Sequence, residues 1–171
     1  MPANAGFTPF YRPLTYSLFA LLAGSWMLCA TTLKAAESDF VPNTDYSPEQ
    51  VVRIVIDALK TNSAANDDDG IATVFQFASP GNRSSTGPLP RFTQMIKRGF
   101  PDMLNHSEAR YDPMQITDNT AVQAVWLLTP SGEEVGYAFQ LGKQKTGNYA
   151  GMWMTEAVMP LGRGNRGGIR I

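Results

Sequence analysis

The chain has 171 residues, of which 43% are hydrophobic and 17% charged, so it is neither a disordered tail nor a multi-pass membrane protein. Its 14 Lys and Arg residues nearly balance 15 Asp and Glu residues, and the net charge of -1 gives no electrostatic reason to expect a nucleic-acid partner. One cysteine, Cys29, and one histidine, His106, exclude an intramolecular disulfide and the usual zinc clusters, so we expect no metal and no cofactor.

The N-terminal segment predicts either a secretory signal peptide or a membrane anchor. Residues 14–33 contain no charged residue and lie between Arg12 and Lys34. This stretch is long enough to span a bilayer, whereas its densest apolar part, residues 18–30, has the length of a signal-peptide hydrophobic region. We therefore assign residues 1–36 to a signal peptide or anchor. The protein is expected to be exported or membrane-anchored, with membrane contact only through residues 14–33, in the periplasm, outside the cell or in an organelle lumen.

Composition divides the rest of the chain into three segments. Residues 37–46 are a polar linker, and residues 47–161 carry the apolar patterns of one folded domain. Residues 162–171 form a Gly- and Arg-rich tail, for which we expect disorder.

The first helix is predicted to begin at a capping sequence. Ser47 precedes Pro48, and Gln50 follows three positions after the serine, which is the pattern of a capping box with proline in the first turn. An apolar stripe then recurs at helical spacing and predicts an amphipathic helix that covers a sheet. The stripe consists of Val51, Val52, Val55, Ile56 and Leu59.

An acidic run, residues 66–70, invites comparison with a calcium-binding loop. The spacing does not fit, because Gly70 at the sixth position would place Ala65 first and Gln76 last, where carboxylates are needed. The acids are better placed to stabilise the N-terminus of a second helix, predicted at residues 71–78.

A Gly- and Pro-rich stretch, residues 79–88, is predicted to be a structured loop rather than a helix or strand. A third helix follows it. Phe92, Met95 and Ile96 supply the apolar side of that helix, and Gly99 is placed to end it.

From residue 108 onward, alternating apolar residues replace the helical period. Strands are predicted at residues 110–116, 121–128, 135–141 and 149–159. In the last of these, Thr155 and Met159 are expected on the face opposite Glu156 and Val158. Helices followed by a meander predict an α+β fold, in which three helices pack on a curled four-stranded antiparallel sheet.

Two blocks of sequence resemble a known family. They are the run Ala78-Ser79-Pro80-Gly81-Asn82-Arg83 and the later run Tyr137-Ala138-Phe139-Gln140-Leu141. On these residues the chain resembles the domain of unknown function 4864 family over residues 47–161. The resemblance implies the cone of helices and curled sheet of the nuclear-transport-factor-two-like superfamily. It also implies a homodimer through the sheet, but no activity, because that architecture hosts many unrelated functions.

The interior of such a cone would provide a cavity with apolar walls. Aromatic residues expected to contribute to it are Phe75, Phe77, Trp126, Tyr137, Phe139 and Trp153. The candidate residues for contacting a ligand or protein partner are Asn82, Arg83, Arg91 and Trp153. For Asn82, Arg83 and Arg91 we favour a structural role, in which they bond carbonyl groups and hold residues 79–90 in shape.

Catalytic residues are harder to find. His106 lies in a polar turn and is predicted to be solvated, and no nucleophile elbow is present. An isomerase-like site would need a carboxylate and a tyrosine donor, and Glu156 with Tyr137 is the pair that the strands offer. We therefore expect a non-enzymatic domain that binds a small apolar ligand or a protein partner. The alternative is a ketosteroid-isomerase-like lyase or isomerase.

Overall fold

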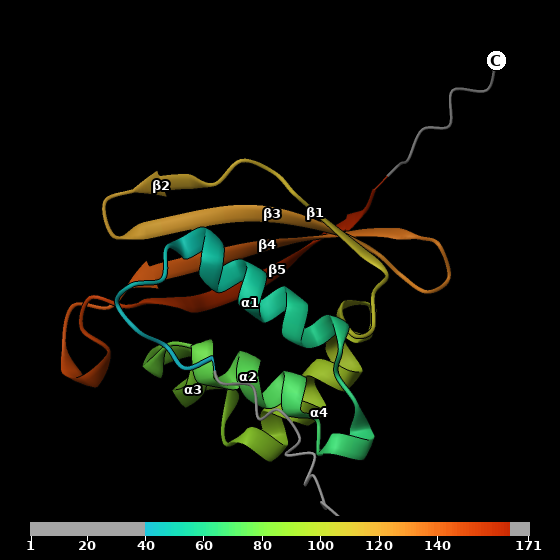
Figure 1. Cartoon of the computed structure of the whole chain (residues 1–171), viewed down its shortest axis with the longest axis horizontal. Helices are drawn as coiled ribbons and strands as arrows, with labels where there is room; N and C mark the ends of the chain where they lie inside the picture. Colours follow the sequence, from blue (N-terminus) through green and yellow to red (C-terminus); the bar gives the residue numbers. More distant parts are fainter. Residues whose placement is uncertain (1–39, 165–171) are drawn as a thin grey trace, which may run out of the picture. The chain divides into compact units, whose positions relative to one another are not determined.

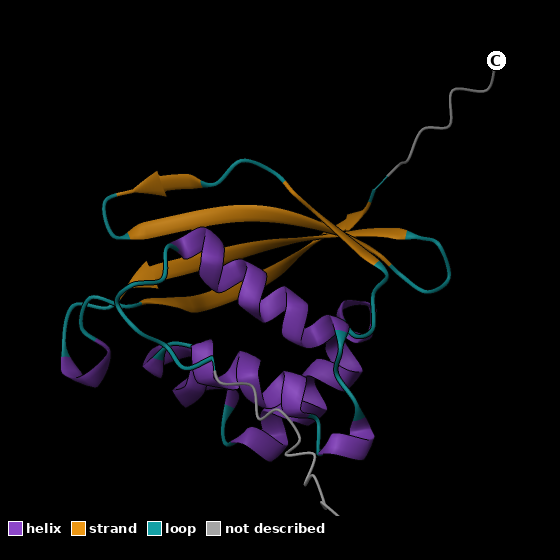
Figure 2. Ribbon diagram, viewed as in Figure 1, coloured by secondary structure: helices purple, strands orange, loops and turns teal. Residues whose placement is uncertain are grey.

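Residues 40–164 are described by the computed structural model, and within them four helices pack on one face of an open five-stranded antiparallel sheet (Figure 1, Figure 2). The predicted α+β class is confirmed, with one more helix and one more strand than expected. The helices are α1 (Pro48–Lys60), α2 (Asp69–Phe77), α3 (Pro80–Thr86) and α4 (Leu89–Gly99). The strands are β1 (Glu108–Tyr111), β2 (Gln115–Thr117), β3 (Thr120–Leu128), β4 (Glu134–Lys143) and β5 (Trp153–Arg163).

The signal or anchor predicted at residues 1–36 lies outside the described residues. Among residues 40–164, no helix has the length and apolar character needed to cross a bilayer.

Helix α1 begins where the sequence predicts it. The Ser47 hydroxyl accepts a hydrogen bond from the Gln50 backbone N–H at 3.3 Å, and the Gln50 side chain accepts one from the Ser47 backbone N–H at 2.8 Å. Pro48 occupies the first helical position, where its missing N–H removes no helical bond. The predicted apolar stripe is buried in the core, as Val51, Val52, Val55, Ile56 and Leu59.

A close backbone contact holds α2 against α1. A β-carbon at Gly70 would lie 2.2 Å from the Ala58 carbonyl oxygen, so glycine is required here. The buried Asn62 side chain strengthens the junction, because its carbonyl accepts from the Ile71 N–H and its amide donates to Asp68, both at 3.1 Å. These contacts fix the turn between α1 and α2, two helices that both contribute to the cavity wall.

The prediction of a loop at residues 79–88 was wrong, because this stretch contains helix α3. Ser79 caps the helix by accepting from the Asn82 N–H at 3.1 Å, and Pro80 takes the first helical position. The hydroxyls of Ser84, Ser85 and Thr86 bond to carbonyl oxygens four residues earlier instead of stabilising turns. The turn preference of these residues is therefore overridden by a capped helix that packs against β5.

The first predicted strand, at residues 110–116, is divided into β1 and β2, which both pair with β3. The division falls at Pro113, which has no N–H to contribute to the sheet. Just before it, the Asp112 N–H still donates to the Ala124 carbonyl at 2.9 Å. A single long strand was therefore the wrong prediction.

Strands β3 and β4 form the centre of the sheet, and their inward side chains follow the predicted alternation on β4: Val135, Tyr137, Phe139 and Leu141 are buried. Trp126 does not join them. It lies between Val125 and Leu127, which are buried in the core, so it points to the opposite face, where its ring lies against Gly136. The expectation that Trp126 lines the interior was wrong.

The alternation predicted for the last strand is shifted by a β-bulge at Glu156. Leu141 pairs with Thr155 and Gln140 pairs with Ala157, which leaves Glu156 without an opposite residue. Side chains beyond the bulge therefore change face. As a result Val158 packs against the core and Met159 is exposed, which reverses the predicted arrangement.

Strand β5 also begins and ends later than predicted. Its expected first residues fall in a 3-10 helix (Gly147–Tyr149) and the turn that follows, so the strand starts at Trp153. It continues to Arg163, which lies in the predicted tail and forms an ion pair with Glu133.

Candidate functional site

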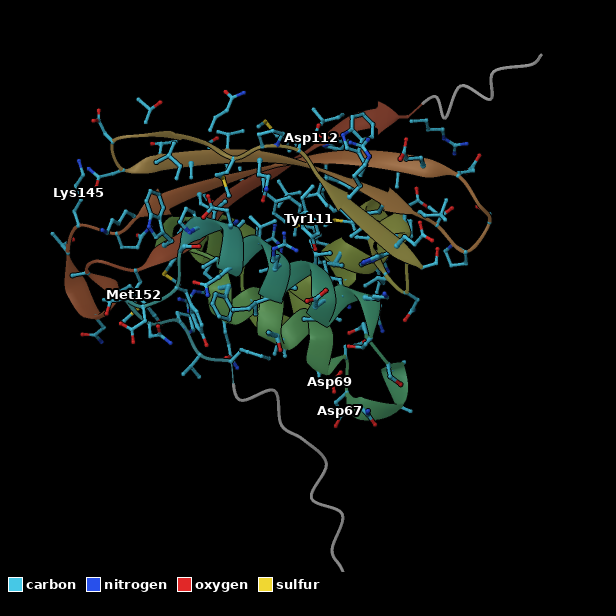
Figure 3. All side chains as sticks on the ribbon, turned by 45° about the horizontal axis from the view of Figure 1, so that its top comes forward. Asp67, Asp69, Tyr111, Asp112, Lys145 and Met152 are labelled. Carbon is cyan, nitrogen blue, oxygen red and sulfur yellow. The ribbon has the colours of Figure 1, made fainter. Side chains whose placement is uncertain are left out.

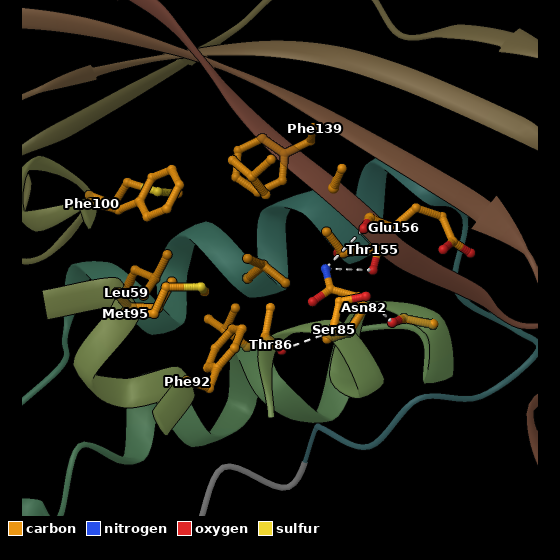
Figure 4. A pocket seen from close by; sticks show the side chains of 18 residues that line it. Leu59, Asn82, Ser85, Thr86, Phe92, Met95, Phe100, Phe139, Thr155 and Glu156 are labelled. Atoms are coloured by element: carbon orange, nitrogen blue, oxygen red, sulfur yellow. Dashed lines mark hydrogen bonds between the residues drawn. The ribbon is translucent and has the colours of Figure 1, made fainter. Parts of the chain in front are cut away.

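A cavity of about 520 Å³ lies between the helices and strands β4 and β5 (Figure 4). All four helices contribute to its wall, together with the 3-10 helix Pro101–Met103. Its volume is within the range of roughly 300–1,000 Å³ that is typical of small-molecule sites. Most of the lining residues are apolar, and the polar ones are Asn82, Ser85, Thr86, Thr155 and Glu156.

Large apolar side chains gather at one end of the cavity. Figure 4 shows Leu59 from α1, Phe92 and Met95 from α4, Phe100 at the C-terminal end of α4, and Phe139 from β4 around this end. They come from distant parts of the sequence, and each belongs to the inward side of its own helix, turn or strand. A ligand in contact with them would lose water from its apolar surface, which stabilises binding by about 25 cal/mol per Å².

The polar end of the cavity is the junction between α3 and β5. Ala78 forms a parallel bridge with Thr155, and the Ser79 N–H donates to the Thr155 carbonyl at 2.9 Å. One turn later the Asn82 amide donates to the carbonyls of Glu156, at 3.0 Å, and Thr155, at 3.4 Å. These bonds fasten the start of α3 to the outer edge of β5 and hold Asn82 at the cavity wall.

Two residues of the cavity wall at this junction each have a buried side-chain oxygen without a hydrogen-bond partner. These oxygens are the hydroxyl oxygen of Thr155, a residue only 4% exposed, and the side-chain carbonyl oxygen of Asn82. A buried hydroxyl or carbonyl that lacks a partner costs about 1–3 kcal/mol. Because both residues line the cavity, they are the groups available to bond to a molecule inside it.

The carboxylate of Glu156 is held by two donors. Ser79 Oγ donates to it at 2.7 Å and Gln144 Nε2 at 2.8 Å. Figure 4 shows this side chain extending away from Phe139 and Phe100. A β-carbon at Gly142 would lie 2.7 Å from Glu156 Oε1, so glycine on β4 makes room for the carboxylate.

Of the predicted binding residues, Asn82 alone lies on the cavity wall. The guanidinium of Arg83 instead lies over the rings of Tyr149, at 4.8 Å, and Phe75, at 5.8 Å. Arg91 is exposed, and Trp153 is half-buried against the core. The carbonyls that Asn82 bonds belong to β5, so its structural contact joins two elements rather than holding a loop in shape.

The aromatic residues expected around the cavity are mostly elsewhere, since Phe139 alone among them is part of its wall. Phe77 is fully buried and packs near Tyr46, with ring centroids 6.1 Å apart. Phe75 packs beside Phe92 at 5.2 Å. These rings contribute to the core, while the cavity wall is made mainly by aliphatic side chains and by Phe92, Phe100 and Phe139.

The pair proposed for acid-base chemistry, Glu156 and Tyr137, is not joined by a hydrogen bond in the described part of the chain. Tyr137 is 5% exposed, packs against Phe100 and does not line the cavity. Burial raises the pKa of the Tyr137 hydroxyl above its ordinary value, and the charge of Asp102 adds to the effect. A neutral tyrosine outside the cavity and a carboxylate bound by two other residues do not form a catalytic pair.

The prediction of a solvated His106 was wrong, because this residue is only 2% exposed. Its Nδ1 lies 2.9 Å from the Met103 carbonyl oxygen, and its Nε2 has no partner. Burial lowers the pKa of His106, so the ring is neutral near neutral pH, with Nδ1–H donating to Met103. His106 does not line the cavity.

Sequence reasoning missed three residues of the polar junction: Ser79, Gln144 and Thr155. Ser79 was included in a predicted loop. Thr155 gave only a weak signal, because the alternation of the last strand grouped it with Met159 on one face without showing which face is inward. Gln144 gave none, because it approaches Glu156 only after the chain turns between β4 and β5.

The acidic run before α2 is part of the helix packing. Asp68 is bonded by Lys97 at 2.6 Å and by Asn62. Asp67, just before it, and Asp69, the first residue of α2, are exposed (Figure 3). The hydrogen bond from Lys97 lowers the pKa of Asp68. Within residues 40–164, no group of three or more His, Cys, Asp or Glu side chains is placed to hold a metal ion.

Fold and cavity together define an α+β domain with a small-molecule-sized space between its helices and its sheet. The family model described as Domain of unknown function (DUF4864) matches residues 45–162, and the chain belongs to that family. The matched segment includes every residue of the cavity wall. No curated protein and no solved structure matches the chain.

Proposed function

We propose that this domain binds a small apolar ligand in its cavity and does not catalyse a reaction on it. The observation that carries the proposal is the cavity itself, with a wall of aliphatic and aromatic side chains and a short polar junction at α3 and β5. Sites of this composition bind by removing apolar surface from water, and a few polar groups orient the ligand.

The arrangement of the titratable groups favours binding over the isomerase-like alternative. General acid-base catalysis needs a side chain that reaches the reacting atoms. The Glu156 carboxylate is occupied by Ser79 and Gln144, and Tyr137 lies outside the cavity wall. A ligand in the cavity would therefore meet no aligned acid and base from this pair.

We also propose that the domain belongs to the nuclear-transport-factor-two-like superfamily. The order of elements supports this, because the helices precede a meandering antiparallel sheet and cover one of its faces (Figure 2). An experimental structure of the protein, compared with members of that superfamily, tests the assignment.

Export or membrane tethering is proposed from the sequence alone. The support is the uncharged, apolar stretch at residues 14–33. Expression of the full chain followed by cell fractionation and N-terminal mass spectrometry tests it. A protein recovered in the cytosol with its N-terminal residues present contradicts the proposal.

Ligand binding is tested directly with an uncharged fluorescent dye, N-phenylnaphthylamine, titrated into the purified full-length protein. We expect saturable fluorescence enhancement as the dye moves from water into the cavity. Mass spectrometry of the protein under non-denaturing conditions then identifies any ligand that co-purifies. Absence of saturable dye binding contradicts the proposal.

Two neighbouring serines provide a matched pair of variants. Ser84 and Ser85 are both exposed on α3 and both bond to a carbonyl four residues earlier, but only Ser85 lines the cavity. Ser85→Trp should place a large ring in the cavity and weaken dye binding by roughly tenfold or more. Ser84→Trp should have little effect. Equal loss in both variants would locate the dye elsewhere.

A further inference from the structure

The chemistry of the α3–β5 junction restricts what the cavity can hold. We infer that the ligand is an uncharged amphiphile with a hydroxyl head group, whose head bonds to Asn82 and Thr155 while its apolar body fills the other end. This inference rests on the proposed binding function and adds the class of ligand.

The two unpartnered oxygens that belong to residues of the cavity wall define the head group. Asn82 Oδ1 is an acceptor only, and the Thr155 hydroxyl both donates and accepts. A ligand hydroxyl can donate to Asn82 and accept from Thr155 at the same time. The Asn82 amide cannot rotate to offer its N–H groups instead, because they are committed to the carbonyls of Glu156 and Thr155.

The charges at the junction disfavour an anionic head group. Neither Lys, Arg nor His lines the cavity, whereas Glu156 does. Arg83, the residue after Asn82, has its guanidinium over Tyr149 and Phe75. Its Nε and Nη2 are buried without hydrogen-bond partners, but Arg83 does not line the cavity. A carboxylate or phosphate at the junction would therefore be desolvated beside a negative charge and two carbonyl oxygens, with no cation on the cavity wall to contact it.

A cationic head group is disfavoured for a different reason. The Glu156 carboxylate already accepts from Ser79 and Gln144, and its side chain extends away from the apolar end of the cavity (Figure 4). An ammonium group has three donors and no acceptor, so it would leave the Thr155 hydroxyl proton without a partner. It would also lose its hydration without a carboxylate directed at it.

The cavity volume limits the body of the ligand. A water molecule takes about 30 Å³ in the liquid, so a cavity of about 520 Å³ has room for on the order of 15 atoms of similar size. Medium-chain alcohols fit this limit. Their flexible chains can also follow the wall between Leu59, Phe92 and Phe139.

Three probes that share one chain length separate the head groups. Decanol, decanoate and decylamine are each used to displace N-phenylnaphthylamine from the full-length protein, at about pH 8, where the acid is ionised and the amine is protonated. We expect decanol to bind most tightly, by roughly tenfold over decanoate. Tightest binding by decanoate or decylamine overturns the inference.

Two variants test the assigned groups. Glu156→Gln keeps the shape of the side chain and its bonds to Ser79 and Gln144, because the serine hydroxyl can reverse its direction, and it removes the charge. We expect the preference for decanol over decanoate to shrink. Thr155→Val should weaken decanol binding roughly three- to tenfold, whereas Thr73→Val, at a buried threonine outside the cavity, should leave it unchanged.

The outcomes distinguish the two proposals. If the dye does not bind, the binding function itself fails. If the dye binds and all three probes displace it equally, or if Glu156→Gln and Thr155→Val both leave the decanol preference intact, the binding function stands and the hydroxyl head group is wrong. Circular dichroism confirms that each variant is folded, and Glu156→Gln provides the test if Thr155→Val does not fold.

Discussion

The two faces of the sheet differ in whether the hydrogen bonds of their polar side chains are satisfied. On the face opposite the helices, Trp126 donates to Asp112 at 2.9 Å, and Arg110 lies over the Trp126 ring while bonding to Asp112 at 2.6 Å. On the helix side, Thr155 and Asn82 have buried oxygens without partners. Polar side chains that bond to one another, such as Trp126, Asp112 and Arg110, stabilise the fold, whereas unpaired polar atoms beside a cavity are available to a ligand.

The largest change in the free energy of unfolding is expected on the sheet face opposite the helices, where Trp126 bonds to Asp112. A β-carbon at Gly136 would lie 2.6 Å from the Trp126 ring, so Gly136→Ala must displace the indole from Asp112. We expect a loss of about 1–3 kcal/mol in the free energy of unfolding, measured by urea denaturation. Gly99→Ala is the control, because nothing lies within 4 Å of its β-carbon position. A similar loss in both variants contradicts the role assigned to the Trp126 contact.

On the sheet face that borders the cavity, a substitution at Thr155 should not lower the free energy of unfolding. Thr155→Val removes a buried hydroxyl that has no partner, so the free energy of unfolding should stay the same or rise by up to about 1 kcal/mol. Thr73→Val removes a hydroxyl that donates to the Asp69 carbonyl at 3.0 Å, and should lower stability by about 1 kcal/mol. Urea denaturation of both variants measures the difference. A clear loss of stability in Thr155→Val would mean that its hydroxyl is satisfied within the protein.

The smallest effect near neutral pH concerns His106, whose Nε2 is also unpaired although the residue does not line the cavity. Burial lowers the pKa of His106 in the folded state below its ordinary value of 6.5. The unfolded chain then binds the proton first as the pH falls, so folding stability is complete above about pH 6.5 and decreases below it, down to the folded pKa.

The measurement for His106 is the free energy of unfolding as a function of pH, in the wild type and in His106→Gln. The slope below pH 6.5 should become smaller in the variant. Asp68 does not mask this change, because its lowered pKa affects stability only below its ordinary value of 3.8. Equal slopes in the two proteins would show that His106 titrates alike in the folded and unfolded states.

Local sequence patterns predicted the elements whose signals lie within a few residues. The Ser47–Gln50 capping box and the alternation of β4 are of this kind, and both were confirmed. The α+β class followed from the order of such elements. Local preferences failed at α3, where serine, glycine and proline favour turns in isolation but the helix is capped by Ser79 and fastened to β5.

The candidate site was less predictable because it depends on contacts between distant residues. Asn82 was singled out, but its partners on β5 follow more than seventy residues later in the chain. The bulge at Glu156 leaves no mark in an alternating pattern and changes which later side chains reach the helices. His106 was assigned to solvent from its polar neighbours, whereas its burial results from packing between α1 and the start of the sheet.

The open sheet leaves β5 as an edge strand, which invites strand-to-strand aggregation. Several features of this strand reduce the hazard. Its first half is blocked by the bridge from Ala78, its second half contains Pro160, and its register is interrupted by two bulges. The same α3–β5 junction that supplies the polar end of the cavity therefore also protects the protein from self-assembly through its backbone.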